Sequence, residues 1–296
     1  MEIRNLITFV QVAELNSFTK AAKILDYSQS TVSFQIKQLE AELDCLLFER
    51  VGHTITLTER GKELLQYAQN ISRLTDEFNE QQAAPRMLEG YIHVVTPDSV
   101  CEDMITTNYL DFHRRYPGIS LKFTTADTED MIRMISQNEA DLMLTLDSHL
   151  YRGDFVIAKE APVPMHFVTG AGSPYATDRE LSILDIVDCP FILTERSMGY
   201  RRVFDEVMAQ RSLQILPVLE IGRTDLITSL LASGMGISFL PDFVTQRGIE
   251  SGTLQYLNVT DIRIDIWKQL IHHRGKWISK GLAALIEYIK EMEFER

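Results

Sequence analysis

Short polar side chains gather between Ser28 and Lys37, and their types suit hydrogen bonding to another large molecule. Hydroxyl and amide groups both donate and accept hydrogen bonds, which matches the base edges and phosphate oxygens of a nucleic acid. The residues of this run are Ser28, Gln29, Ser30, Thr31, Ser33, Gln35 and the basic Lys37. Phe34 lies among them, and its ring is expected either to pack at the edge of its own domain or to contact a thymine methyl group or a sugar.

Two short helices must hold this polar run in place. Ser17 is the expected N-cap of the first helix, and it is predicted to contact DNA together with Thr19 and Lys20. Ser28 is the expected N-cap of the second helix, over about residues 29–42. The apolar stripe of this second helix is Val32, Ile36, Leu39 and Leu43. Two helices joined by the turn at 26–28 are typical of a helix-turn-helix, whose second helix enters a DNA major groove.

A hairpin is predicted after the second helix, with its tip at residues 50–54 and its return strand at 56–58. Arg50 and His53 would then lie near a phosphate backbone, or else they are solvated charges of a loop. An amphipathic helix near the N-terminus, with Ile3, Leu6 and Val10 on one face, completes the small core. The order of these elements predicts a winged helix-turn-helix.

A long helix is predicted from its N-cap at Thr58 to about Gln82, which at ~1.5 Å per residue gives roughly 36 Å. Its apolar stripe is Leu64, Leu65, Ala68, Ile71, Leu74 and Phe78. A domain of about 60 residues is too small to cover so long a stripe, so we expect the same helix of a second subunit to pair with it. The expected product is a dimer with two DNA-reading heads.

The charge balance is unfavourable for DNA binding by one copy of this segment. The whole chain of 296 residues has a net charge of −13 and an isoelectric point of about 5.0. Residues 1–60 hold six Lys and Arg against eight Asp and Glu. Because phosphate contacts need Lys and Arg, we expect affinity to depend on where the cations lie and on the pairing of two copies.

Residues 1–85 resemble the DNA-binding domain and linker helix of LysR-type transcriptional regulators. The matching residues are Phe9, Ser17-Phe18-Thr19, Ala21-Ala22, Leu25, Ser28-Gln29-Ser30, Val32-Ser33, Gln35-Ile36, Leu39-Glu40, Leu43, Leu47-Phe48-Glu49-Arg50 and Leu57-Thr58-Glu59-Arg60-Gly61. Phe34 stands where the family usually has a polar or basic residue, and Ser30 stands where proline is common. The resemblance implies a sequence-specific regulator that binds double-stranded promoter DNA, is not an enzyme and forms a homotetramer of two dimers.

Strands alternate with helices after Gly90, which predicts a parallel α/β sheet. The expected strands cover 91–96, 119–123, 141–145, 190–194, 218–221 and 234–241. This part resembles the effector-binding domain of the same family, which has the two-lobed fold of periplasmic solute-binding proteins. The resemblance implies lobe one at 90–160 and 268–296, lobe two at 161–267, and a hinge near 161–167 and 264–271.

The whole chain is therefore expected to be an α+β multi-domain protein. Its predicted parts are a winged helix-turn-helix over 1–58, a linker and dimerisation helix over 59–85 and an effector-binding domain over 90–296. The last residues of the linker helix are the alanines at 83–84, with Pro85 ending it.

A small-molecule effector is expected where strands end and helices begin, because helix N-termini converge at the carboxyl ends of parallel strands. The predicted effector-binding residues are Thr96, Asp98, Ser99, Thr125, Ser197, Arg223 and Thr224. Each hydroxyl is either a ligand contact or a helix cap, and Arg196, Arg201 and Arg223 are either carboxylate partners or surface charges. Hydroxyls favour an anion, whereas Asp98, Asp127 and Asp225 favour an amine, so the expected effector is a small carboxylate or an amino acid.

No catalytic, cofactor or metal site is predicted. Cys45, Cys101 and Cys189 are far apart and show neither a CxxC pair nor a zinc spacing. Cys101 follows a strand in the first turn of a helix, so it is either a redox-sensitive thiol or a small buried residue. No recognisable signal peptide and no run of ~18 apolar residues is present, so a cytoplasmic protein without a membrane span is expected. A solute-binding protein and an enzyme on the two-lobed fold are the alternatives.

Overall fold

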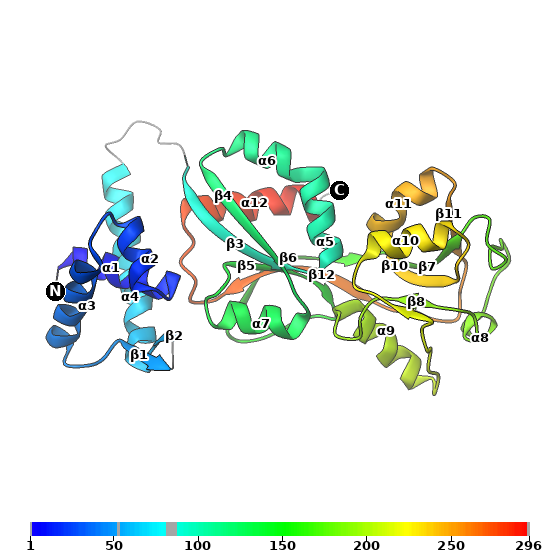
Figure 1. Cartoon of the computed structure of the whole chain (residues 1–296), viewed down its shortest axis with the longest axis horizontal. Coiled ribbons are helices and arrows are strands. Elements are labelled where there is room, and N and C mark those ends of the chain that lie inside the picture. The colour runs from blue at the N-terminus through cyan, green and yellow to red at the C-terminus, as the bar shows by residue number, and fades with distance from the viewer. Residues whose placement is uncertain (1, 52–53, 81–87, 295–296) are drawn as a thin grey trace. The chain divides into compact units, whose positions relative to one another are not determined.

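The computed structural model describes residues 2–51, 54–80 and 88–294. The chain divides into two compact units, one formed by 1–87 with 275–279 and the other by 88–274 with 280–296 (Figure 1). No helix in the described part of the chain is both long and apolar enough to cross a membrane.

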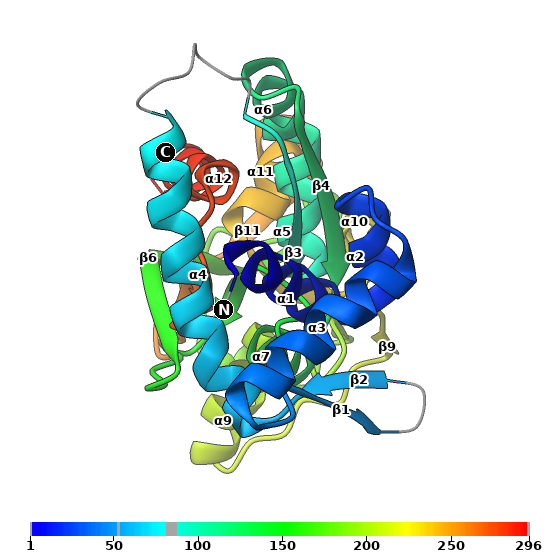
Figure 2. The same ribbon diagram turned by 90° about the vertical axis from the view of Figure 1, so that its left-hand side faces the viewer.

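The described part of the first unit contains four helices and a hairpin (Figure 2). They are α1 (Ile3–Leu15), α2 (Phe18–Ile24), α3 (Gln29–Leu43), β1 (Phe48–Val51), β2 (Thr54–Leu57) and α4 (Glu59–Glu80). α1 packs on α2, α3 and α4, and the rings of Phe9 and Phe18 lie 5.4 Å and 5.7 Å from that of Phe48. β1 pairs antiparallel with β2, as a wing requires, and the predicted glycine tip lies outside the described residues.

The predicted N-caps of the first unit are confirmed. The Ser17 hydroxyl accepts a hydrogen bond from the Lys20 amide at 3.2 Å, and the Ser28 hydroxyl accepts one from the Thr31 amide at 3.1 Å. Thr58 caps α4 in the same way, through the Gly61 amide at 3.0 Å. Each such bond satisfies one of the amides that a helix start leaves unpaired.

The apolar stripe of α4 is partly covered by its own unit. Leu64, Leu65 and Ile71 pack against the buried cluster that includes Ala68. Because these residues already have partners, the first half of the helix does not need a second subunit to cover its stripe. The side chains of Leu74 and Phe78, together with Gln82, lie outside the described residues.

A five-stranded mixed sheet in the order β4-β3-β5-β12-β6 forms the first half of the second unit. Its strands are β3 (Gly90–Thr96), β4 (Ile119–Thr125), β5 (Leu142–Asp147), β6 (Phe155–Val163) and β12 (Ile266–His273). β3 runs parallel to β4 and β5, as predicted for that part of the sequence. β12 runs antiparallel to β5 and β6 because it arrives from the other half of the unit, so the prediction of a purely parallel sheet is wrong.

Helices pack around this sheet. They are α5 (Asp98–Asp103), the π-helical turn η1 (Met104–Asn108), α6 (Tyr109–Arg115), α7 (Thr128–Ser136) and α12 (Lys280–Phe294). The single helix predicted up to Phe112 therefore contains a π turn, a rare irregularity that is often found near functional sites.

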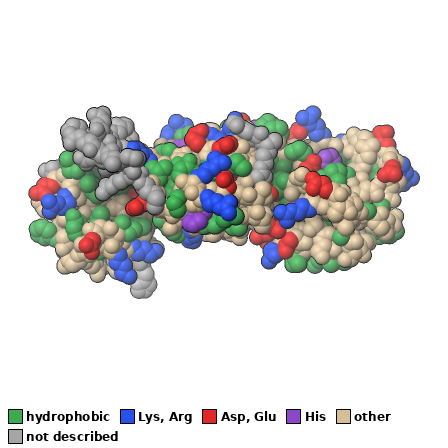
Figure 3. All heavy atoms as spheres, turned by 90° about the horizontal axis from the view of Figure 1, so that it is seen from above, with side chains coloured by type: hydrophobic (Ala, Val, Ile, Leu, Met, Phe, Trp, Pro, Cys, Tyr) green, Lys and Arg blue, Asp and Glu red, His purple; other side chains and the backbone are tan. Residues whose placement is uncertain are grey.

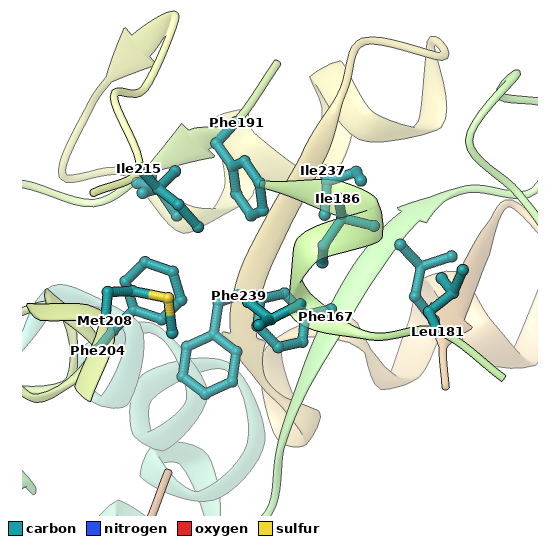
Figure 4. Packing of buried hydrophobic residues seen from close by; sticks show 12 residues of the cluster. Phe167, Leu181, Ile186, Phe191, Phe204, Met208, Ile215, Ile237 and Phe239 are labelled. Carbon is teal, nitrogen blue, oxygen red and sulfur yellow. The ribbon is translucent and has the colours of Figure 1, made fainter. Parts of the chain in front are cut away.

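The second half of the unit has a three-stranded antiparallel sheet, β10-β7-β11, and a parallel pair, β8-β9. The strands are β7 (Met165–Gly170), β8 (Ile192–Leu193), β9 (Leu219–Glu220), β10 (Ile237–Pro241) and β11 (Leu254–Leu257). The helices are α8 (Ile183–Ile186), α9 (Gly199–Gln210), α10 (Thr224–Ala232) and α11 (Asp242–Glu250). Phe167, Phe191, Phe204 and Phe239 meet in the buried core of this half (Figure 4).

The two halves are joined by two chain crossings that lie side by side. β6 leads into β7 through Pro164, and β12 returns with Ile266 opposite Val163 and Trp267 opposite Pro162. These crossings fall in the segments expected to form a hinge, and hinge motion itself stays a prediction. On the face of the second unit drawn in Figure 3, acidic and basic side chains are interspersed.

Candidate functional site

The outer face of α3 is polar and open. Gln29, Ser33 and Lys37 follow one another at intervals of four residues, so they share a face of the helix. Gln29 and Lys37 are exposed and Ser33 is half-buried. Phe34 lies beside them with 68% of its side chain exposed, so the alternative in which its ring packs within its own domain does not hold.

The N-terminal end of α3 carries a small group of hydroxyls. The Ser28 hydroxyl oxygen lies 2.7 Å from that of Ser30 and 2.8 Å from that of Thr31. All three residues are exposed, and α3 has no acidic residue in its first turn. Thr19 and Lys20 of the neighbouring α2 are exposed too. A helix N-terminus with accessible hydroxyls and no carboxylate suits a phosphate group.

The prediction that Gln35 faces DNA is wrong. Gln35 is only 7% exposed, and its Oε1 accepts a 2.7 Å hydrogen bond from the hydroxyl of the buried Thr8. It follows Val32 by three residues and precedes Ile36 by one, so it shares the inward face of α3 and ties this helix to α1. A glutamine side chain satisfied in this way has no access to a base edge.

Three acidic residues of the segment lie toward the C-terminal end of α3, whereas the exposed Asp26 lies two residues before Ser28. Glu40 points back into its own unit, where its carboxylate accepts from the Leu47 amide at 2.8 Å and the Phe48 amide at 3.4 Å. Glu42 and Asp44 follow at the C-terminal end of α3. Of the eight acids counted against six cations over residues 1–60, these three are therefore placed away from the N-terminal face of the helix.

The structure does not test two predicted contacts of the wing. Arg50 lies in β1 opposite Ile55, but its side chain is outside the described part, and His53 lies outside the described residues altogether. Their roles as phosphate contacts stay predictions.

Three of the predicted effector-binding residues hold buried hydroxyls that lack a hydrogen-bond partner among the described residues. They are Thr96 at the end of β3, Ser99 in α5 and Thr224 at the start of α10, exposed by 0%, 4% and 2%. Neither α5 nor α10 has a side-chain cap, so these hydroxyls do not serve as helix caps. A buried hydroxyl left unpaired costs about 1–3 kcal/mol, which a ligand atom could recover.

Arg223 is less available to a ligand than predicted. Its guanidinium is held by Asp225 through bonds of 2.9 Å and 2.6 Å, and its Nε lies 4.0 Å from the Asp98 carboxylate. The Arg223 guanidinium also holds the pKa of Asp225 below its usual value. Burial raises the pKa of Asp98, and the nearby positive charge of Arg223 only partly opposes this. The Arg223–Asp225 ion pair thus lies at the N-terminal end of α10.

The remaining predicted contacts are exposed. Thr125 ends β4 directly opposite Thr96 in the sheet register, and Ser197 precedes α9. Neither of them lines the groove that Ser99 and Thr224 share. Asp127 serves as the N-cap of α7, where it accepts from the Asp130 amide at 2.9 Å.

Two neighbouring residues behave differently from what the sequence suggested. Arg201 is 1% exposed, and its guanidinium donates hydrogen bonds to the Thr194 carbonyl at 2.6 Å and to the Asp205 carboxylate at 3.0 Å. It is therefore a buried structural residue and not a surface charge. Tyr200 is also buried, and the pKa of its hydroxyl is raised by that burial and by the negative charge of Asp98. No sequence signal places Tyr200 near Asp98, since an aromatic residue in a helix predicts only core packing.

Cys101 lacks the properties of a reactive thiol. Burial, followed by the negative charges of Asp98 and Glu102, raises its pKa to about 11. Reactivity requires the thiolate, which this environment disfavours at neutral pH.

Comparison with known proteins places both units in one family. A model described as "Bacterial regulatory helix-turn-helix protein, lysR family" matches residues 3–62, and one described as "LysR substrate binding domain" matches 85–293. The chain is 26% identical to the RuBisCO operon transcriptional regulator of Allochromatium vinosum, covering 98% of this chain and 95% of that protein. It is 27% identical to the transcriptional activator CmpR of Synechocystis, covering 95% and 92%.

Solved structures of the same kind share the fold. A point variant of full-length OxyR from Pseudomonas aeruginosa has 19% sequence identity and a TM-score of 0.69, covering 98% of this chain and 95% of its own. Full-length BenM has 21% identity and a TM-score of 0.54, covering 99% and 98%.

Proposed function

Because this chain belongs to the LysR family of transcriptional regulators, we propose that it reads promoter DNA with the exposed face of α3 and responds to a small carboxylate or amino acid. It is a regulator and not an enzyme, and its second unit is an effector-binding domain. The proposed reading residues are Gln29, Ser30, Ser33, Phe34 and Lys37. The proposed effector site lies between the two halves of the second unit, in a groove lined mainly by helices.

The observation that carries the effector site is the set of unpaired buried hydroxyls. Ser99 and Thr224 come from the two different halves of the second unit, and both line one groove of about 550 Å³. A volume of this size is within the usual range for small-molecule sites. A ligand that bonds to both hydroxyls would hold the two halves in one arrangement.

Such a ligand acts by selecting an arrangement. It shifts the equilibrium between open and closed halves only to the extent that it binds one of them better. In our proposal the closed arrangement changes how subunits pack, and so changes the spacing between the reading heads. We propose a homotetramer made of two dimers, because paired heads supply more phosphate contacts than a single head with few cations. Its place of action would be the cytoplasm.

The test combines DNA binding with ligand response. Gel shifts and footprints on the region upstream of the protein's own gene should show protection, and added carboxylates or amino acids should alter the footprint. Thr224→Val removes one unpaired hydroxyl at constant shape, so it should weaken that response and leave DNA binding without effector unchanged. A protein that binds no fragment of its own genome, or that responds only to a peroxide or a metal ion, would exclude this function.

A further inference from the structure

The groove beside Ser99 and Thr224 has walls from four helical segments. α5 and η1 form one side, and α10 and α11 form the other. Its charged lining residues are Glu102, Asp103, Asp225, Glu250 and Arg247. Four carboxylates against one guanidinium leave an excess of negative charge, even though Arg223 next to the groove neutralises Asp225 at 2.6 Å.

Glu102 is a carboxylate in this groove that is open to a ligand. The Glu250 carboxylate accepts a hydrogen bond from the side-chain amide of Gln246 at 2.8 Å. The Glu102 carboxylate has no ion pair or hydrogen bond within the described part of the chain. Its side chain is exposed, yet partial loss of hydration raises the pKa of the carboxyl. The negative charges of Asp225 and Asp98 add to this, and the positive charges of Arg223 and Arg247 only partly oppose it. A positive charge placed here would relieve that repulsion.

The unpaired hydroxyls stand next to this carboxylate. Ser99 and Glu102 are three residues apart on α5, so they lie on the same face of the helix. Thr224 begins α10 on the opposite wall. Both hydroxyls are more than nine-tenths buried, lack a partner among the described residues and line the groove, so this is more than a cluster of acidic side chains.

The chemistry favours an organic cation over the other small ligands. An anion alone would face four carboxylates in the groove. No group of three or more His, Cys, Asp or Glu in the described residues is arranged to hold a metal ion, so a metal is a poor occupant. An ammonium group donates three hydrogen bonds, and it can donate to hydroxyl and carboxylate oxygens at once.

We propose that the groove binds the ammonium group of an organic amine, with Glu102 as its counter-ion and the Ser99 and Thr224 hydroxyls bonded to the adjoining polar atoms. This inference rests on the proposed function and narrows its effector to molecules that carry an amine in the groove. The carboxylate of an amino acid is compatible with it, whereas a simple dicarboxylate is not.

The experiment uses four probes on the full-length protein, measured by isothermal titration and by the footprint. L-lysine and cadaverine carry an ammonium group at the end of a chain, pentane-1,5-diol has the cadaverine chain with hydroxyls in place of both ammonium groups, and tetramethylammonium is a cation without N–H donors. We expect lysine or cadaverine to bind, and pentane-1,5-diol and tetramethylammonium to bind at least about tenfold more weakly.

Variants then test the named residues. Glu102→Gln should weaken binding of the amine about tenfold or more, because a charge-assisted bond becomes a neutral one. Glu129→Gln, at an exposed position on α7, is the matched control and should bind as the wild type does. Equal binding by Glu102→Gln, equal binding of pentane-1,5-diol, or no binding of either amine overturns the inference. If carboxylates still alter the footprint through Thr224, the proposed function survives; if no ligand and no DNA bind, both fail.

Discussion

The Arg202 guanidinium on α9 donates a 2.5 Å hydrogen bond to the Asp147 carboxylate at the end of β5, and so joins the two halves of the second unit. Asp147 is fully buried and accepts further bonds from the Thr128 hydroxyl at 2.8 Å and the Ser148 amide at 2.6 Å. Gly199 starts α9 so close to this group that a Cβ atom would lie 2.6 Å from Asp147 Oδ2.

Loss of the Arg202 side chain should therefore destabilise the protein. Arg202→Ala leaves a buried carboxylate without its charged partner, which is expected to lower the free energy of unfolding by about 1–3 kcal/mol. Thermal unfolding of the full chain measures this as a lower Tm. Glu206→Gln is the control, since it removes the other, exposed partner of Arg202 and should change stability little. Equal effects of both substitutions would show that the bond to Asp147 contributes no more than a surface pair.

Gln29→Ala should weaken specific DNA binding without lowering stability. Gln29 is exposed at the start of α3, and its side chain makes no hydrogen bond to another described residue. Its removal should therefore leave the free energy of unfolding unchanged. Loss of a base contact costs about 1–3 kcal/mol of binding free energy. Titrated footprints on specific and random DNA measure the change, and a variant with unaltered specificity would place the reading face elsewhere.

Gln35→Ala should lower stability without weakening specific DNA binding, which is the opposite of the result expected for Gln29→Ala. The Thr8 hydroxyl loses its acceptor inside the core, which costs about 1–3 kcal/mol of stability. Thermal unfolding should show a lower Tm, while specific DNA binding below that temperature stays near the wild-type value. The double variant Thr8→Val with Gln35→Ala removes both partners and should recover part of the loss. A stable Gln35→Ala protein with weakened DNA binding would restore the original prediction for this residue.

Much of the fold could be predicted because the informative interactions are local. Ser17, Ser28 and Thr58 cap helices through amides three residues away, so the sequence alone identifies them. Gln35 and Arg201 could not be placed, because their burial depends on a partner helix or strand outside their own helix. The antiparallel return of β12 has a similar origin: pairing with β5 and β6 spans more than a hundred residues in each case and leaves no local pattern.

Cys101 should react slowly with electrophiles at neutral pH. A pKa of about 11 lies roughly four units above pH 7, so about one thiol in ten thousand is ionised there. Because burial disfavours the thiolate, labelling should rise with pH up to about 11. Iodoacetamide labelling followed by peptide mass spectrometry measures the rate at each pH, with free cysteine as the reference. Labelling at pH 7 as fast as that of free cysteine would contradict this and revive a redox role.

Lys268→Met should lower stability more than any exposed substitution. The Lys268 ammonium on β12 donates to the Glu293 carboxylate of α12 at 2.8 Å, and Asn108 of η1 donates to the other oxygen at 2.7 Å. The ammonium also lies 5.0 Å from the ring centre of Phe243 on α11. Both charged side chains are buried, so removal of one leaves the other uncompensated, at a cost of about 3–5 kcal/mol.

The pair can be separated from simple packing by a double-mutant cycle. Lys268→Met with Glu293→Gln removes both charges, so the combined loss in the free energy of unfolding should be smaller than the sum of the two single losses. Thermal unfolding of the four proteins gives the cycle. Strict additivity would mean that the two charges do not act together. Since β12 carries the return crossing from the second half of the unit, a measured coupling would also show that this crossing is anchored to α12 and η1 through a charge.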